Sequence, residues 1–163
     1  NEQAAAIAPE LARRLLARED GERIFVLHWP NEVGDVENAV YLSQRDVREL
    51  QFAKASIATG WSLLVQELGI DVSEIQQVLL AGSFGSYLSP ASAVRIGLVP
   101  KLALPRIVSA GNVAGEGAKM ALLSMQERHA ATAMFDEVEY VELSDREDFN
   151  DLFVEQLAFP GER

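Results

Sequence analysis

Two segments of the sequence join a short apolar run to a glycine-rich turn and then to a helical pattern. The first reads VLLAGSFG, residues 78–85, and the second reads RIVSAGNVAGEG, residues 106–117. Their apolar runs do not alternate with polar residues, which is typical of strands covered on both faces of a parallel sheet. Ligands in such sheets bind where strands end and the chain turns into a helix. These two turns are therefore the first candidates for a binding site.

The rest of the chain continues the same alternation. We expect strands at ERIFVLHW, AVYL and EVEYVEL, and helices over residues 1–20, 43–69, 90–96 and 119–134. Ser144 and Glu147 predict the cap of a last helix that ends at Leu157. Alternating strands and helices predict an α/β layered domain in which at least part of the sheet is parallel.

The longest predicted helix begins at a capping box formed by Ser43 and Asp46 and ends at Gly69. Its apolar positions recur every three or four residues and predict one face that packs along the whole helix. They are Val47, Leu50, Ala53, Ile57, Trp61, Leu64 and Leu68. The other face carries Gln44, Arg45, Arg48, Gln51 and Lys54.

Composition excludes several classes of protein. The 163 residues, 48% of them apolar and 24% charged, predict one globular domain, and the longest apolar runs fall short of the ~18–20 residues that cross a bilayer. The chain has no cysteine, so it cannot hold a disulfide or a cysteine-ligated iron–sulfur cluster. A net charge of −11 disfavours nucleic acid as a partner. Because the chain begins at Asn1 without methionine or signal peptide, we expect a fragment of a longer protein.

Three places have residues suited to a ligand, and each also has a plain structural interpretation. The turn from Gly82 to Gly85, with Ser83 and Phe84, allows close approach of a flat ligand, or is only a tight turn with Phe84 in the core. The segment from Gly111 and Asn112 to Gly117 allows a ligand or close helix–sheet packing. Arg48, Gln51 and Lys54 form a ridge that suits a planar ligand or is a solvated charged face.

Other familiar sites are missing from the sequence. It contains neither GxxxxGK[ST] nor GxGxxG, and no G-x-S-x-G elbow for a nucleophilic serine. His28 and His129 have no partner at metal-ligand spacing. Residues 136–148 contain seven acidic residues and one arginine, which predicts a solvated face or a docking surface for a basic partner.

Three runs of the sequence resemble one family. LSQRDVRELQFAK, VLLAGSFGSYL and GNVAGEGA are similar to TQKDIRELQLAK, LAGAFGNYI and GNAAGxGA in the C-terminal part of the ATP-dependent reductive activators of corrinoid proteins. The order and the spacing also agree, and the resemblance covers roughly residues 20–158. Ser43 stands where threonine is usual and Ser83 where alanine is common. Neither change affects a backbone contact.

The resemblance implies the fold and the site residues. It implies that residues 1–163 form a single domain. This domain would be the second ribonuclease-H-like lobe of an actin-like ATPase, with a mixed sheet flanked by helices. Carried over by position, Gly82, Ser83, Phe84 and Gly85 form the adenosine turn. Arg48, Gln51 and Lys54 flank adenine or ribose, and the segment from Gly111 and Asn112 to Gly115 belongs to the interdomain hinge.

The resemblance also implies a function for the intact protein. ATP with Mg²⁺ would drive reduction of a Co(II) corrinoid protein to Co(I), with the electron supplied by an upstream [2Fe–2S] domain. We expect a cytoplasmic lobe that holds adenosine without a catalytic residue of its own and that is inactive alone, since no D-x-G-T segment is present. Its partners would be the first lobe, the iron–sulfur domain and the corrinoid protein. A homodimer is also compatible with the resemblance. The alternatives are a docking or dimerisation module with a vestigial pocket, and the lobe of a small-molecule kinase.

Overall fold

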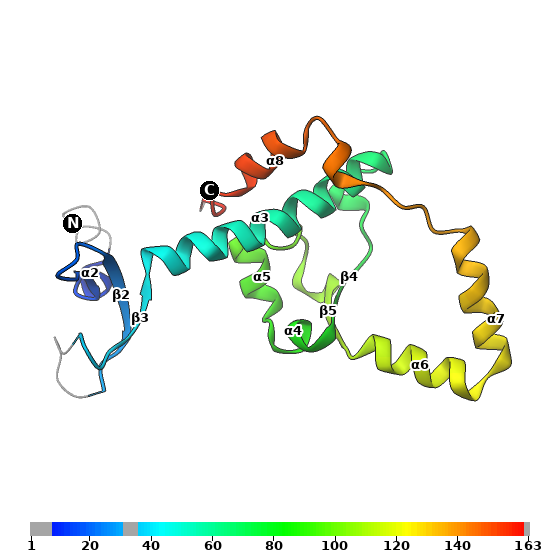
Figure 1. Cartoon of the computed structure of the whole chain (residues 1–163), viewed down its shortest axis with the longest axis horizontal. Coiled ribbons are helices and arrows are strands. Elements are labelled where there is room, and N and C mark those ends of the chain that lie inside the picture. Colours follow the sequence, from blue (N-terminus) through cyan, green and yellow to red (C-terminus); the bar gives the residue numbers. More distant parts are fainter. Residues whose placement is uncertain (1–7, 31–35, 162–163) are drawn as a thin grey trace. The chain divides into compact units, whose positions relative to one another are not determined.

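The computed structural model describes residues 8–30 and 36–161. The chain divides into two compact units, residues 1–52 and residues 53–163. The division falls within the long helix α3, Gln44–Glu67 (Figure 1).

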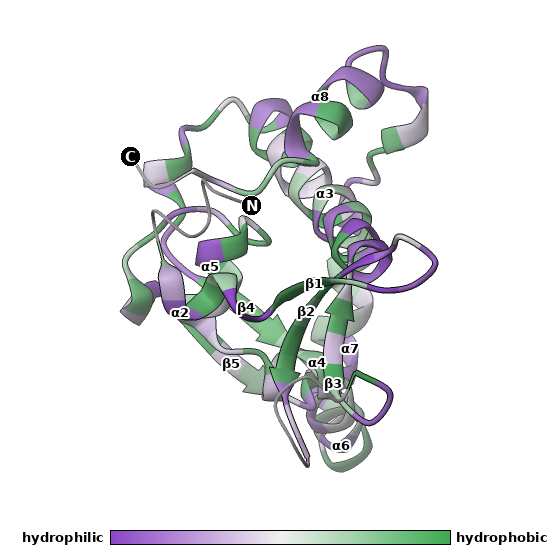
Figure 2. Ribbon diagram, turned by 90° about the vertical axis from the view of Figure 1, so that its left-hand side faces the viewer, coloured by the Kyte–Doolittle hydropathy of each residue, from purple (hydrophilic) through white to green (hydrophobic). Residues whose placement is uncertain are grey.

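The first unit contains a three-stranded antiparallel sheet in the order β1-β2-β3. The strands are β1 (Leu15–Ala17), β2 (Arg23–His28) and β3 (Val40–Ser43), and the short helix α2 (Pro9–Ala12) precedes them. Ile24 and Val26 on β2 are buried, and the middle of this strand is hydrophobic in Figure 2. Two of the predicted strands, at ERIFVLHW and AVYL, are therefore confirmed.

The predicted helix over the first 20 residues is wrong beyond Ala12. Leu15 lies opposite Phe25 in an antiparallel pair, and Gly21 adopts a positive φ of 83° in the turn between the two strands. The Arg14 guanidinium donates to the carbonyls of Val26 and Leu27, at 3.0 and 2.6 Å. The residues after Ala12 that the helical spacing had assigned to the helix therefore belong to a hairpin. Residues 1–7 of the predicted helix lie outside the described part of the chain.

Helix α3 has the ends that the sequence predicts. The Ser43 N–H donates to Asp46 Oδ2 at 2.8 Å, and the Asp46 N–H donates to Ser43 Oγ at 3.1 Å. At the other end Gly69 has a φ of 64°, and the N–H of Ile70 donates to the carbonyl of Val65. This is the Schellman arrangement that ends many helices at glycine.

The predicted apolar face of α3 is wrong. Its buried residues are Lys54, Ala55, Ala58, Thr59 and Leu63, whereas Ile57, Leu64 and Leu68 of the predicted stripe are exposed. The buried face is formed mostly by small side chains, which let other backbone segments come close. A count of large apolar residues cannot detect such a face.

The second unit contains two parallel strands, β4 (Val78–Ala81) and β5 (Ile107–Gly111), which lie side by side in Figure 1. Helices α4 (Gly82–Tyr87) and α5 (Pro90–Ile96) connect them, and the short turns η1 (Val72–Glu74) and η2 (Leu104–Arg106) precede the strands. The core is formed by Ala93, Leu98, Val99 and Ile107. The predicted parallel pairing is confirmed, but the expectation that both faces are covered is wrong at Leu79, which is 59% exposed.

Helix α5 follows its local signals closely. Ser89 caps its beginning by accepting from the Ser92 N–H, Pro90 is its first residue, and Gly97 ends it with a φ of 76°. The Trp61 indole N–H on α3 donates to the carbonyl of Leu98 at 3.2 Å, just beyond this end.

The predicted helix over residues 119–134 is two helices. Helix α6 (Val113–Leu123) begins within the glycine segment, and α7 (Met125–Ala133) follows it and leads into η3 (Met134–Asp136). Ser124 between them is extended, and its Oγ accepts from the Glu127 N–H at 3.2 Å. Ser124 and Glu127 thus start a new helix where the apolar pattern predicts a continuous one.

The predicted strand EVEYVEL is also wrong. Among the described residues it pairs with no strand, and Glu142 accepts hydrogen bonds from the hydroxyls of Tyr140 and Ser144, both at 2.6 Å. Glu142 also accepts from the Ser144 N–H at 3.2 Å and so caps the short 3-10 helix η4 (Leu143–Asp145). Ser144 therefore does not cap the last helix α8 (Phe149–Gln156), which begins after Asp148.

Candidate functional site

The ends of β4 and β5 bring the two glycine turns to the same edge of the sheet. The strands are parallel, and Ala81 pairs with Gly111 across an irregularity in register that follows Leu80. The carboxyl ends of parallel strands meet at one edge, so Gly82 and Gly111 lie near each other by this pairing. The sequence predicted each turn separately, and the pairing joins them.

Gly82 and Gly111 share two properties that leave room at this edge. Their φ angles are 81° and 65°, which side chains with a Cβ rarely adopt. Apart from the adjacent residues and, for Gly82, the backbone of its own helix, no described atom would lie within 4 Å of a Cβ built on either glycine. Both positions therefore present open backbone rather than a close contact inside the protein.

Gly85 has a different role from Gly82. It is buried, and a Cβ at this position would lie 2.5 Å from both the carbonyl carbon and the oxygen of Leu80. The Ser109 hydroxyl on β5 donates to the Gly85 carbonyl at 3.0 Å. Gly85 thus holds α4 tightly against the sheet, and its ligand contact stays a prediction.

Ser83 and Phe84 line an apolar hollow of about 460 Å³ together with Tyr87 and Leu88. Phe84 is 67% exposed, so the interpretation that it is a core residue is wrong for the described structure. Ser83 and Phe84 stand immediately beside the open position of Gly82. The arrangement suits the face of a planar group.

Asn112 begins helix α6 and explains the small residues that follow it. Its Oδ1 accepts from the Gly115 N–H at 3.0 Å, and a Cβ on Gly115 would lie 2.6 Å from the Asn112 Nδ2. The amide side chain is therefore occupied as a helix cap. Glu116 in the first turn pairs with Lys119 at 2.7 Å on the surface.

The three predicted residues of helix α3 differ in their surroundings. Arg48 is exposed and Gln51 is half-buried, and both lie in the first unit. Lys54 lies in the second unit and is 1% exposed, so the solvated-face interpretation is wrong for this residue. Contact of all three with one ligand stays a prediction.

The buried amine of Lys54 contacts the C-terminal segment. Its Nζ donates to the Ala158 carbonyl at 2.6 Å and lies 5.8 Å from the centre of the Phe159 ring. Burial removes water from the ammonium group and lowers the pKa of Lys54 below its ordinary value.

The described residues suit the base and the sugar of a nucleotide cofactor better than they suit its metal ion. The open glycines and the apolar hollow suit a base and a sugar. No group of three or more His, Cys, Asp or Glu within the described ranges is placed to hold a metal ion, so we assign no step to Mg²⁺. With no cysteine in the chain, an iron–sulfur cluster has no thiolate ligand here.

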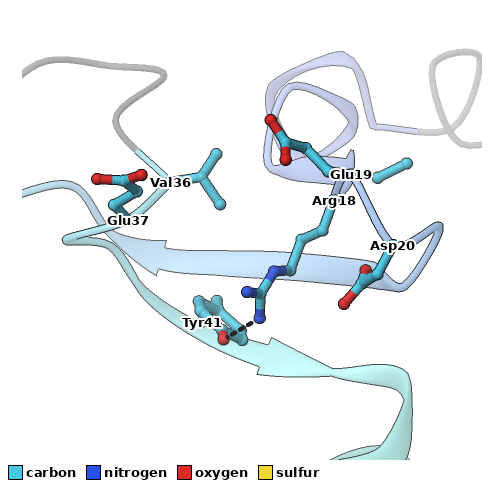
Figure 3. Close-up of a pocket in the computed structure, with 7 residues that line it drawn as sticks. Arg18, Glu19, Asp20, Val36, Glu37 and Tyr41 are labelled. Atoms are coloured by element: carbon cyan, nitrogen blue, oxygen red, sulfur yellow. Dashed lines mark hydrogen bonds between the residues drawn. The ribbon is translucent and has the colours of Figure 1, made fainter.

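The first unit contains a cavity that the sequence did not predict. It has a volume of about 490 Å³, and Figure 3 shows the Arg18 side chain directed to Tyr41, with Glu19, Asp20 and Glu37 around it. The Arg18 guanidinium donates to the Tyr41 hydroxyl at 2.6 Å. Its residues come from a hairpin and from the approach to β3, so no local motif marks it.

Comparison with known proteins then gives the family. The family model for the C-terminal domain of RACo, the ASKHA domain, matches residues 2–163. The chain belongs to this family. The predicted resemblance and the actin-like α/β fold are thereby confirmed, and membership in an actin-like ATPase family implies nucleotide binding.

Two relatives are similar over almost the whole chain. The corrinoid activation enzyme RamQ of Eubacterium limosum is 32% identical over 152 residues, which are 93% of this chain and 26% of RamQ. A solved structure, "Reductive activator for corrinoid,iron-sulfur protein", is 30% identical with a TM-score of 0.76 and covers 96% of this chain. The chain spans 24% of that protein, about a quarter of either relative. No helix within the described residues is both long and apolar enough to cross a membrane.

Proposed function

We propose that the whole chain is the second lobe of an actin-like ATPase and that the edge formed by Gly82, Ser83, Phe84 and Gly111 binds the adenosine part of ATP. The observation that supports this most directly is the pairing of Ala81 with Gly111, which brings two open glycines to one edge. Phe84 and the neighbouring hollow supply an apolar surface for the base, and the exposed backbone supplies polar groups for the sugar.

In the intact protein this lobe would serve a reductive activator of a corrinoid protein. The relatives support that role by what their names state. One electron, supplied by an iron–sulfur domain elsewhere in the protein, would reduce Co(II) to Co(I). ATP would favour the arrangement of lobes that permits this transfer, because a ligand shifts a conformational equilibrium by its difference in affinity for the two states. The residues of this chain would hold adenosine and supply no reacting group.

Calorimetric titration of the intact protein with ATP and ADP tests the site. We expect Gly82→Val to abolish binding, because the branched side chain would fill the open space beside Ser83. The matched control is Gly69→Val at the end of α3. Gly69 also has a positive φ, and apart from its adjacent residues no described atom would lie within 4 Å of a built Cβ. Each valine carries a backbone penalty of roughly 1–2 kcal/mol, so thermal melts should shift alike.

The two variants separate loss of the site from loss of the fold. Retained binding in Gly69→Val and lost binding in Gly82→Val support the proposal. Equal affinity of Gly82→Val and the unaltered protein contradicts it. So does the absence of measurable heat at millimolar nucleotide with the folded, unaltered protein.

A second candidate function is a docking module for the corrinoid partner. Large apolar side chains are exposed on α6, α7 and η3, among them Leu122, Leu123 and Phe135. The acidic residues 136–148 follow directly along the chain. Apolar groups beside a concentrated charge are typical of a surface that meets a partner of opposite charge.

A further inference from the structure

The hydroxyl of Ser109 on β5 connects the two glycine turns. Ser109 lies two residues before Gly111, and its Oγ donates to the carbonyl of Gly85 on α4 at 3.0 Å. Helix α4 begins at Gly82, in the other turn. The bond therefore ties the strand that leads into the second turn to the short helix that starts in the first.

Helix α4 meets both strands of the sheet at the same pair of residues. Leu80 of β4 lies opposite Ser109 of β5 in the parallel pairing. Gly85 approaches the Leu80 backbone so closely that a Cβ would lie 2.5 Å from the carbonyl group, and it accepts the hydrogen bond from Ser109. The close contact limits how near α4 comes to the sheet, and the hydrogen bond fixes its position over β5.

The register of the sheet changes directly after this pair. The next pair is Ala81 with Gly111, so β5 contains one extra residue, Ala110, between the two pairs. A bulge of this kind bends a strand locally and is common beside functional sites. Ser109 and Gly111, on either side of the bulge, thus set the position of α4 and of the open glycine within three residues of one strand.

The end of α4 explains why the Gly85 carbonyl accepts a bond from a side chain. The last carbonyls of a helix have no N–H donor within the helix, and α4 has only six residues. The Leu88 N–H donates to the carbonyl of Phe84 at 3.2 Å, and the Ser109 hydroxyl serves the carbonyl of Gly85. Ser109 itself is exposed, so water can replace its hydroxyl and a variant at this position should still fold.

Helix α4 carries the surface that we assign to the base of ATP. Ser83 and Phe84 directly precede Gly85, and Tyr87 and Leu88 follow it within three residues; together they line the apolar hollow. The Phe84 side chain is 67% exposed, so packing inside the protein holds it only weakly. Its place beside Gly82 therefore depends on where the backbone of α4 is held.

We propose that Ser109 is a positioning residue of the adenosine site. Its hydroxyl holds α4 through the Gly85 carbonyl, so that the surface of Ser83 and Phe84 stands beside the open backbone of Gly82 and Gly111. Ser109 acts through Gly85 and needs no contact with the ligand. This inference rests on the function proposed above for the glycine edge.

Calorimetric titration of the intact protein with ATP tests the role of the hydroxyl. Ser109→Ala should bind ATP about three- to tenfold more weakly, the range expected for the loss of one hydrogen bond. Ser109→Thr keeps the hydroxyl and should restore the affinity. The matched control is Thr132→Ala, which removes a hydroxyl that donates to the Arg128 carbonyl on α7 and should leave the affinity unchanged.

Amide chemical shifts of the labelled full chain test the position of α4 without any nucleotide. Ser109→Ala should shift the amides of residues 83–88, and Ser109→Thr should return them toward their original positions. Shifts confined to residues 107–111 would show that the hydroxyl does not hold α4 and would overturn the proposal.

The titrations separate failure of this inference from failure of the adenosine site. If the unaltered protein binds ATP and Ser109→Ala binds it equally well, Ser109 has no positioning role, while the adenosine site stands. An equal loss in Ser109→Ala and Thr132→Ala would also overturn the role. If the folded, unaltered protein does not bind ATP at all, both the adenosine site and the role of Ser109 are wrong.

Discussion

At the scale of single residues, the glycines of the two turns differ in the reason why their positions require glycine. Gly82 and Gly111 need a positive φ and face open space, whereas Gly85 needs the absence of a Cβ because the Leu80 backbone lies 2.5 Å away. Gly117 in α6 needs neither, since its φ is not positive and a built Cβ would meet no described atom within 4 Å apart from its neighbours and the backbone of its own helix. Two different physical reasons thus account for Gly82, Gly111 and Gly85, and neither applies to Gly117.

Alanine at Gly85 should therefore destabilise the protein. The added methyl group meets backbone atoms that cannot rotate away, and overpacking of this kind costs about 1–3 kcal/mol of unfolding free energy. Gly117→Ala is the control and should gain roughly 0.5–1 kcal/mol from helix propensity. Urea unfolding of both variants measures the difference, and equal midpoints would contradict the close approach of α4 to β4.

At the scale of elements, helix ends are defined by a few hydrogen bonds. The carboxylate of Asp46 accepts from the backbone N–H of Ser43, and that bond is the main reason that the pKa of Asp46 lies below its ordinary value. The bond between Asp46 and the Ser43 side chain lowers the pKa further. A carboxyl whose folded pKa is depressed stabilises the fold above its unfolded pKa, and this contribution is lost as the pH falls through the folded pKa.

Asp46→Asn should therefore lower stability at neutral pH and lose its effect in acid. The difference in unfolding free energy from the unaltered protein should be constant above the unfolded aspartate pKa of roughly 3.9 and shrink below it. Denaturant unfolding between neutral and acidic pH measures this difference. Glu49→Gln, an exposed change on the same helix, is the control. A difference that does not depend on pH would contradict the role of the ionised carboxylate.

At the scale of the whole molecule, the net negative charge is concentrated in one stretch of the chain. The stretch 136–148 accounts for −6 of the net −11. Arg146 within it pairs with Glu67 of α3 at 2.6 Å and with Asp148 at 3.0 Å. These pairs attach the end of the stretch to α3 and leave Glu137 and Glu139 exposed.

Reversal of Glu137 and Glu139 to lysine should weaken capture of the corrinoid protein if this surface docks it. The loss should be largest at low salt, because salt screens exposed charges. Asp151→Lys/Glu155→Lys on α8 makes the same change in net charge at exposed positions and is the control. Binding assays at several salt concentrations measure both variants. An equal loss of binding in both variants would mean that net charge alone causes the effect, which would contradict docking at this surface.

Local signals were enough wherever a few neighbouring residues decide the structure. Ser89, Pro90 and Gly97 bound α5, and Ser43, Asp46 and Gly69 bound α3, as the sequence predicts. The two glycine turns after apolar strands were also predicted correctly. In each case the deciding hydrogen bond or dihedral angle lies within a few residues along the chain.

The sequence by itself thus determined the caps, the glycine turns and the family. The tertiary structure decided which strands pair and which faces are buried: Leu15 joined a strand because Phe25 lies opposite, and the EVEYVEL segment found no partner strand among the described residues. It also brought Gly82 to Gly111 and Lys54 to Ala158, which are 104 residues apart. Such contacts depend on atoms distant in sequence, and a local pattern of apolar and polar residues does not contain them.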